Sequence, residues 1–133
     1  MEPNKKLLLL FERNAQEILE TMNNNKNYTN MVTEIILDEI TKCKSPSIYT
    51  IANKSSLSVR NLQLCLQNEN TSYTNLIKEV RRHMAEKYLT DRNISIDEIA
   101  YYLGFSEASA FHRAFRSWAG LTPIQFRKSV LNY

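Results

Sequence analysis

GFSEASAFHRAFRSWAGLTPIQF, residues 104–126, holds both glycines of the chain, its one tryptophan and four of its five phenylalanines. Glycine adopts the left-handed backbone conformation without steric cost and often stands just after the end of a helix. Gly104 is therefore expected to open a tight turn after one helix, and Gly120 to end the next. The aromatic residues between them recur at helical spacing, which predicts a helix with an aromatic inward face.

This segment belongs to the second copy of an internal repeat. The pair IA at 51–52 returns at 99–100, an offset of 48 residues. Beyond the following turn the match shifts by one residue, so that Leu62 and Leu66 align with Phe111 and Phe115. Each copy predicts a short helix, a turn and a second helix that begins at a serine, which is the helix-turn-helix arrangement. The second copy has one extra residue at the start of its second helix.

Serines mark the expected helix starts. Ser95 and Glu98 form the S-x-x-E pattern of a capping box, in which each side chain binds the other residue's backbone N–H. Comparable N-cap candidates are Ser47, Ser58 and Ser106. Ser56 stands where the second copy has Gly104, so the first turn is expected to be more strained or differently shaped.

The copies are joined by a segment that reads as one helix. Ile77, Val80, Met84 and Tyr88 form a single apolar stripe without a helix breaker, which predicts a linking helix over about 74–90. A helix of about 15 residues spans ~22 Å. Few glycines and prolines and many helix-forming residues indicate an all-α fold. Its helix-turn-helix units are predicted at about 47–68 and 95–118.

Residues 1–28 are expected to form a separate N-terminal part. Helical spacing of apolar residues predicts an amphipathic helix over 5–22, suited to contact with a sensor region or to dimerisation, followed by a polar linker. A further helix at about 29–42 opens the predicted DNA-binding domain of residues 29–133. The apolar run at 7–11 is too short for a secretion signal or a membrane span. We therefore expect no membrane contact and a cytoplasmic location.

Charge and side-chain chemistry limit the function. Residues 1–41 carry a net −3 and residues 42–133 a net +6, so the second part is the one expected to meet an anionic partner. Cys43 and Cys65 are expected to be reduced and buried, and they form no metal-ligand spacing with the two histidines. Without a nucleophile beside a base or a glycine-rich phosphate loop, we expect no enzyme, metal or cofactor.

In a helix-turn-helix the second helix enters the major groove of DNA, at an angle that the first helix sets. The side chains off the apolar stripes are predicted to face outward: Arg60, Asn61, Gln63, Leu64 and Gln67 in the first copy, and Glu107, Ala108, Ser109, His112, Arg113 and Arg116 in the second. Arginine pairs with guanine edges and glutamine with adenine edges, each pair worth about 1–3 kcal/mol of discrimination. Double-stranded DNA is the predicted partner.

Other polar residues are candidates for contacts with DNA phosphates, which supply affinity without sequence preference. The predicted phosphate contacts are Ser58, Lys54, Ser106, Arg116, Lys78 and Arg81. The same group of basic side chains includes Arg82, Lys87, Arg127 and Lys128. For each of them, an ordinary solvated side chain is the alternative.

Six segments occur in a familiar order: SIDEIA at 95–100, LGFS at 103–106, Phe111, RAF at 113–115, GLTP at 120–123 and FR at 126–127. Together they resemble the signature of the AraC/XylS family of bacterial transcription regulators. The resemblance covers about residues 29–129. It implies two helix-turn-helix subdomains, joined by a helix, that place two recognition helices in successive major-groove segments about one helical turn (~34 Å) apart.

The resemblance also implies which residues read bases. The family's base-reading positions fall on Arg60, Gln63, Leu64, Ala108, Ser109 and Arg113, and His112 is a further candidate because it lies beside Arg113. Leu64 and Ala108 replace polar residues often found there and are limited to apolar contacts, for instance with thymine methyl groups.

The family's usual role implies a sequence-specific regulator, an activator that works with RNA polymerase in the nucleoid. Two alternatives stay open. The chain is either a piece of a larger regulator or a free-standing short member, and a helical protein-interaction module with this fold would not bind DNA on its own.

Overall fold

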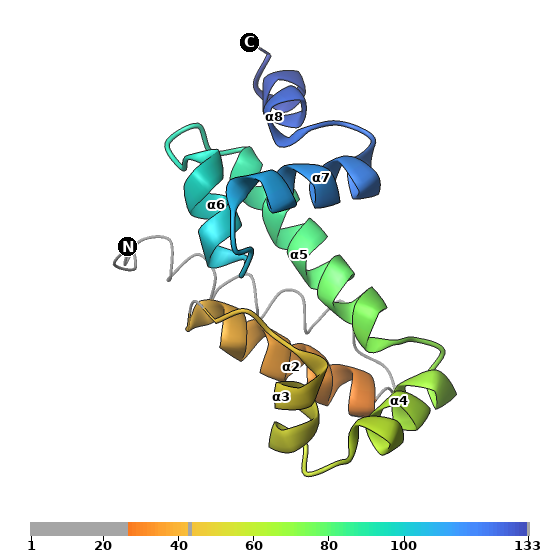
Figure 1. The fold of residues 1–133 in the computed structure, drawn as a ribbon. Helices are drawn as coiled ribbons and strands as arrows, with labels where there is room; N and C mark the ends of the chain where they lie inside the picture. The colour runs from red at the N-terminus through yellow and green to blue at the C-terminus, as the bar shows by residue number, and fades with distance from the viewer. Residues whose placement is uncertain (1–26, 43, 133) are drawn as a thin grey trace. The chain divides into compact units, whose positions relative to one another are not determined.

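The structure is a computed structural model that describes residues 27–42 and 44–132, and within them it contains helices and turns and no strand. The helices are α2 (Asn27–Thr41), α3 (Ile48–Lys54), α4 (Val59–Asn68), α5 (Tyr73–Leu89), α6 (Ile96–Tyr102), α7 (Ala108–Ala119) and α8 (Pro123–Leu131) (Figure 1). The predicted all-α fold is confirmed. The chain divides within α5 into two compact units, Met1–Val80 and Arg81–Tyr133.

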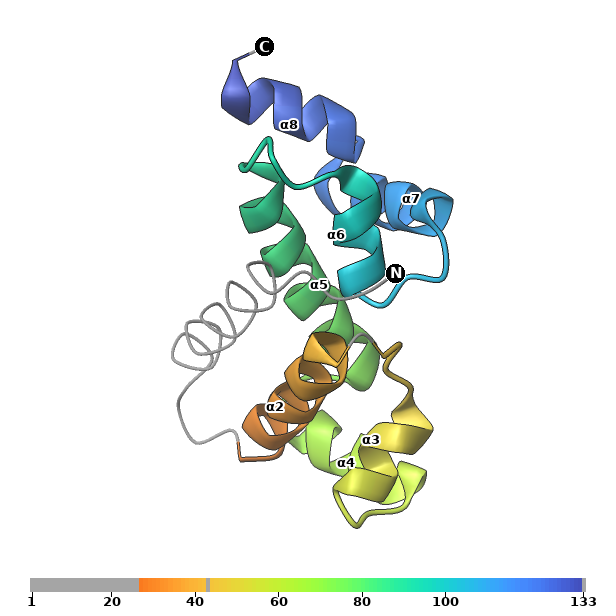
Figure 2. The same ribbon diagram turned by 90° about the vertical axis from the view of Figure 1, so that its left-hand side faces the viewer.

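In the described part of the first unit, α2, α3 and α4 pack against one another (Figure 2). Their apolar stripes meet in a core whose fully or almost fully buried members include Val32, Ile36, Leu37, Ile40, Ile51, Ala52, Leu62 and Leu66. The predicted caps at Ser47 and Ser58 are confirmed, because these side chains accept hydrogen bonds from the N–H groups of Thr50 and Asn61. The short helices α3 and α4 therefore start where the sequence predicts.

In the second unit, α6 packs on α7 and α7 on α8. The buried residues of this unit include Met84, Ala85, Tyr88, Leu89, Ile99, Ala100, Tyr102, Leu103, Phe111 and Phe115. The capping box at the start of α6 is confirmed: Glu98 N–H donates to Ser95 Oγ at 3.0 Å, and Ser95 N–H donates to Glu98 Oε1 at 3.2 Å.

Each copy of the repeat contains three helices, whereas the sequence pattern predicts two. The buried stripe of α2, formed by Val32, Ile36 and Ile40, corresponds at the same offset of 48 residues to Val80, Met84 and Tyr88 of α5, which are also buried. Val32 and Val80 are identical, whereas the other two pairs, Ile36 with Met84 and Ile40 with Tyr88, share only their burial. The repeat therefore extends to the helix that precedes each helix-turn-helix pair, α2 before α3–α4 and α5 before α6–α7.

Helix α8 was not predicted. It begins with Pro123, and Thr122 caps it in a second capping box, with Gln125 N–H donating to Thr122 Oγ1 at 3.2 Å and Thr122 N–H to Gln125 Oε1 at 3.0 Å. One residue of α8 corrects a prediction. Arg127, named among the basic side chains for phosphate contact, is 9% exposed and donates to the backbone carbonyls of Leu89, Asp91 and Ile94. It holds the loop after α5 instead.

Two predictions fall outside the described residues: the amphipathic helix over 5–22 and the state of Cys43. Cys65 carries a free thiol, but it is half-buried and not buried as expected. None of the described helices combines the length and the apolar character needed to cross a membrane.

Candidate nucleic-acid interface

The two helix-turn-helix turns have the same hydrogen bonds. In the first, Leu57 N–H donates to Ala52 O at 3.0 Å and Ser56 N–H to Asn53 O at 3.1 Å; in the second, Phe105 N–H donates to Ala100 O at 3.0 Å and Gly104 N–H to Tyr101 O at 3.1 Å. The backbone is left-handed at both central residues, with φ of 56° at Ser56 and 86° at Gly104. The expected difference between the turns is therefore one of strain and not of shape, and it belongs to the first turn. Its strain lies in the conformation of Ser56, which costs a non-glycine residue about 1–2 kcal/mol.

Helix α4 is anchored on one side and open on the other. Leu62 and Leu66, four residues apart, are 0% exposed and fix the inward face. The exposed side chains of the helix are Arg60, Asn61, Gln63, Leu64, Gln67 and Asn68. Leu64 is 40% exposed, which is unusual for a leucine on a short helix whose other leucines are fully buried. The predicted outward face of the first copy is therefore available to a ligand.

Helix α7 is anchored by aromatic packing. Phe111 and Phe115 are 0% exposed, and their ring centroids lie 5.9 Å apart at 62°. Phe115 also meets half-buried Trp118 at 6.4 Å and Phe126 of α8 at 5.4 Å. The predicted inward face is confirmed. The outward side carries exposed Ser109, Arg113 and Arg116, while Ala108 and His112 are half-buried.

The start of α7 differs from the prediction. Its N-cap residue is Glu107, which makes no side-chain capping hydrogen bond, so the expected cap at Ser106 is wrong. The extra residue of the second copy moves the helix start past the serine. Ser106 is exposed in the turn, and the side chain of Glu107 gives the helix no N-terminal cap. The first N–H groups of a helix that lacks such a cap can bind an acceptor such as a phosphate oxygen.

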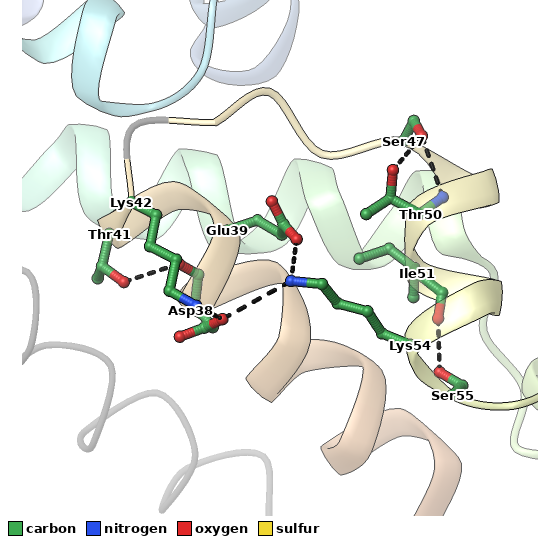
Figure 3. A network of polar contacts seen from close by, with 9 residues as sticks. All are labelled: Asp38, Glu39, Thr41, Lys42, Ser47, Thr50, Ile51, Lys54 and Ser55. Carbon is green, nitrogen blue, oxygen red and sulfur yellow. Dashed lines mark hydrogen bonds and ion pairs between the residues drawn. The ribbon is translucent and has the colours of Figure 1, made fainter.

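Lys54, a predicted phosphate contact, is bound inside the first unit (Figure 3). Its Nζ forms an ion pair with Oε1 of Glu39, whose side chain is 3% exposed, and lies 3.9 Å from Oδ2 of Asp38. The hydrogen bond to Glu39 raises the pKa of Lys54 above its ordinary value, against a smaller desolvation effect. Because the ammonium group neutralises a buried carboxylate that ties α3 to α2, we leave Lys54 out of the candidate interface.

Arg81, another predicted phosphate contact, binds the second turn. Its Nε donates to Leu103 O at 3.0 Å and its second terminal nitrogen to Gly104 O at 3.3 Å. The guanidinium carbon lies 4.3 Å from the ring centroid of Phe105. We therefore leave Arg81 out of the interface too. Lys78, on the preceding turn of α5, is exposed and stays a candidate.

Glu69, which ends α4, has a role that sequence reasoning missed. Its carboxylate accepts hydrogen bonds from Tyr28 N–H at 3.0 Å, Thr29 N–H at 2.8 Å and Thr29 Oγ1 at 2.7 Å. It therefore caps the first turn of α2, where a negative charge also complements the helix dipole. Since the bonded residues lie 40 and 41 positions away, no local pattern could have found this cap.

Beside the outward face of α4 lies a pocket of about 260 Å³. It is lined by Ile48, Gln63, Gln67, Thr71, Ser72, Tyr73 and Thr74. Gln63 and Gln67 of α4 thus border a hollow at the start of α5.

Comparison with known proteins agrees with this geometry. The sequence profile of a family described as "Helix-turn-helix domain" matches residues 51–129. The ornithine utilization regulator of Pseudomonas aeruginosa is 36% identical over 84 residues, which cover 63% of this chain and 25% of that protein. The Msm operon regulatory protein of Streptococcus mutans is 33% identical over 130 residues, or 96% of this chain and 46% of that protein.

A solved structure shares the architecture. The crystal structure of a DNA-binding transcriptional dual regulator from Escherichia coli K-12 superposes with a TM-score of 0.72 at 25% identity, covering 84% of this chain and 97% of that one. Two helix-turn-helix pairs in one chain, each with an exposed second helix, are the fold of a class of transcription regulators. The chain belongs to the AraC/XylS family of transcription regulators. It spans about a quarter to a half of the length of the two curated relatives described above.

Proposed function

We propose that the chain binds double-stranded DNA in a sequence-specific way and regulates transcription, with α4 and α7 entering successive segments of the major groove. One observation carries this proposal. In both units the same hydrogen-bonded turn leads into a helix that is fixed by two fully buried side chains four residues apart, while its polar outer side is exposed. A rigid helix with an open polar face is what readout of base edges requires.

The proposed base contacts follow from exposure and chemistry. Arg60, Gln63 and Arg113 are exposed and carry the donors and acceptors that pair with guanine and adenine edges. Leu64 offers an apolar contact for a thymine methyl group. Ser109 is exposed at the start of α7, and half-buried Ala108 and His112 flank the same region with smaller accessible surfaces.

The proposed phosphate contacts are the four exposed residues of the predicted set that remain once Lys54 and Arg81 are left out: Ser58, Lys78, Ser106 and Arg116. The net +6 of residues 42–133 supports them, because a basic surface attracts DNA over a Debye length. The side chain of Ser58 accepts from Asn61 N–H at 3.0 Å, and its hydroxyl proton remains able to donate to a phosphate oxygen.

Transcription activation, a contact with RNA polymerase and action in the bacterial cytoplasm are further parts of this proposal, supported by family membership. The curated relatives are named as regulators and are longer than this chain. We propose that residues 5–22 contribute a dimerisation or sensor contact. The alternative, a protein-interaction module, would be favoured if the two outer faces were buried, but Arg60, Gln63 and Arg113 are exposed.

Selection of bound sequences from a random DNA pool, followed by titration of the selected site at several salt concentrations, tests the proposal. We expect selection to enrich one sequence that contains two separate blocks. The affinity for this site should fall as salt rises, and the slope of log affinity against log salt concentration should be about −0.9 for each phosphate neutralised. No enrichment, or no binding at low salt, would contradict DNA binding and leave the interaction module as the better explanation.

A further inference from the structure

Three consecutive residues of the second helix-turn-helix turn are held by one side chain. Arg81 donates from Nε to the carbonyl of Leu103 and from a terminal nitrogen to that of Gly104, and its guanidinium group lies over the ring of Phe105. Leu103 is the C-cap residue of α6. Carbonyl groups at a helix C-terminus carry partial negative charge, so a cation is stabilising there.

The contact depends on the shape of arginine. The planar guanidinium presents several N–H donors in a fixed fork and stacks on an aromatic face at the same time. A lysine ammonium is a compact charge that is strongly hydrated, and it does not reproduce two directed hydrogen bonds together with stacking. The turn is therefore held by geometry as well as by charge.

The ring that Arg81 covers is packed against the recognition helix. The centroid of the Phe105 ring lies 5.5 Å from that of Phe111 and 6.3 Å from that of Trp118. These two residues stand near opposite ends of α7, with Arg113 between them. A displacement of Phe105 would therefore be transmitted to the whole length of the helix.

We propose that Arg81 is a positioning residue for DNA recognition: by binding the turn between α6 and α7, it sets the orientation in which α7 presents Arg113 to bases. This inference rests on the proposed DNA-binding function. It also replaces the sequence-based expectation that Arg81 contacts a phosphate.

The first unit serves as an internal comparison. At the offset of 48 residues the counterpart of Arg81 is Thr33, a short side chain that is 0% exposed. In the first unit, a hydrogen bond from Ser55 Oγ to Ile51 O at 2.7 Å lies at the corresponding turn. The arginine contact thus belongs to the second unit, and its loss should affect readout by α7 and not by α4.

The test compares Arg81→Lys and Arg81→Met with Arg82→Met in the full chain. Arg82 is the matched control for the fluorescence measurement because it is the neighbouring arginine, and its Nε pairs with Glu86 Oε1 at 3.0 Å on the same helix. The emission spectrum of Trp118, the one tryptophan of the chain, reports the packing beneath α7 without any DNA. Chemical unfolding of each variant defines the conditions in which it is folded.

Under those conditions we expect the emission of Trp118 to shift in both Arg81 variants and not in Arg82→Met. Affinity for the selected site should fall roughly tenfold in both Arg81 variants, as for the loss of one good base contact. Single base changes in the block read by α7 should cost less than in the unaltered protein, whereas those in the block read by α4 should cost as much as before. The salt slope and the affinity for random DNA should stay unchanged.

Other outcomes would overturn the inference. If Arg81→Lys behaves like the unaltered protein in emission and in binding, charge alone suffices. If the loss is equal for all sequences and the salt slope falls by about 0.9, Arg81 contacts a phosphate. If discrimination falls equally in both blocks, Arg81 acts on general stability. If the unaltered protein shows no sequence preference, the proposed function is refuted. If it shows a preference and Arg81→Lys binds the selected site equally well with the same emission, only this inference is refuted.

Discussion

Oε1 of Glu69, at the end of the recognition helix α4, accepts hydrogen bonds from both the backbone N–H and the hydroxyl of Thr29, at 2.8 and 2.7 Å. The start of α2 and the end of α4 are thereby joined through a carboxylate. A side-chain cap of this kind is worth about 1–2 kcal/mol. It couples a helix that precedes the first helix-turn-helix unit to the helix proposed to read DNA.

Glu69→Ala is expected to lower the free energy of unfolding by about 1–2 kcal/mol, because the first N–H groups of α2 lose their acceptor. Urea unfolding followed by circular dichroism measures the change. Glu69→Gln should lose less, since the amide oxygen still accepts hydrogen bonds while the favourable charge at the helix start is removed. Glu79→Ala, at an exposed glutamate of α5, is the control and should be nearly neutral. Equal effects at the two glutamates would contradict the cap.

Ser56→Gly is expected to stabilise the protein. Removing the side chain at a φ of 56° relieves about 1–2 kcal/mol of strain, while the added freedom of the unfolded chain offsets about 0.5–1 kcal/mol. A net gain of about 0.5–1 kcal/mol should appear in thermal or chemical unfolding. Ser55→Gly provides the contrast, because Ser55 has a φ of −86° and should lose stability. Destabilisation by both changes would mean that the serine conformation is not strained.

The stability that Lys54 contributes should depend on pH in the alkaline range. The pKa of Lys54 is raised above its ordinary 10.5 by the hydrogen bond to Glu39. A raised pKa of a basic group adds stability that is fully present below the ordinary value and is lost as pH rises through the raised value. Lys54→Met should therefore be less stable than the unaltered protein at neutral pH, and the difference should shrink above pH 10.5.

Lys42→Met is the matched control for this measurement. Lys42 pairs with Asp38 at 3.0 Å, but both side chains are about half exposed, and such a pair is worth about 0.3–0.5 kcal/mol. Denaturant midpoints measured across the alkaline range compare the two variants. A difference between Lys54→Met and the unaltered protein that stays constant with pH would show that the ion pair does not stabilise the fold.

Arg113→Ala and Arg116→Ala should differ in kind. Arg113 is a proposed base contact, so its loss should weaken the selected site by about 1–3 kcal/mol and leave binding to random DNA nearly unchanged. Arg116 is a proposed phosphate contact, and its loss should weaken all sequences alike and lower the salt slope by about 0.9. Titrations at several salt concentrations distinguish them. The reverse pattern would exchange the two roles.

Leu64 should respond to a single methyl group on DNA. Replacing thymine by uracil removes the C5 methyl and keeps base pairing, so the proposed apolar contact predicts weaker binding at one position of the α4 block. Leu64→Ala should make binding indifferent to that replacement. Affinities of both proteins for both DNAs form a double-mutant cycle that isolates the contact. Additive effects would show that Leu64 does not meet a thymine.

The helix-turn-helix units were predictable because their signals act within a few residues. A serine or threonine accepts from an N–H three positions on, a glycine permits a left-handed turn, and leucines or phenylalanines four apart define an inward face. The same locality explains the errors. Ser106 looks like the other capping serines, but the extra residue after it moves the helix start to Ala108. Helix α8 was not predicted because it is short and because Thr122 and Pro123, which begin it, were interpreted as a turn.

The amino-acid sequence by itself determined the all-α class, the two turns and the outward faces of α4 and α7. Tertiary structure alone decided what the long charged side chains bind. Arg81, Lys54 and Arg127 resembled solvated cations in the sequence, yet each binds a carbonyl or carboxylate inside its own unit. These partners lie 15 or more residues away along the chain. Flexible side chains of this length reach many positions, and folding selects the one where a buried acceptor would otherwise remain unpaired.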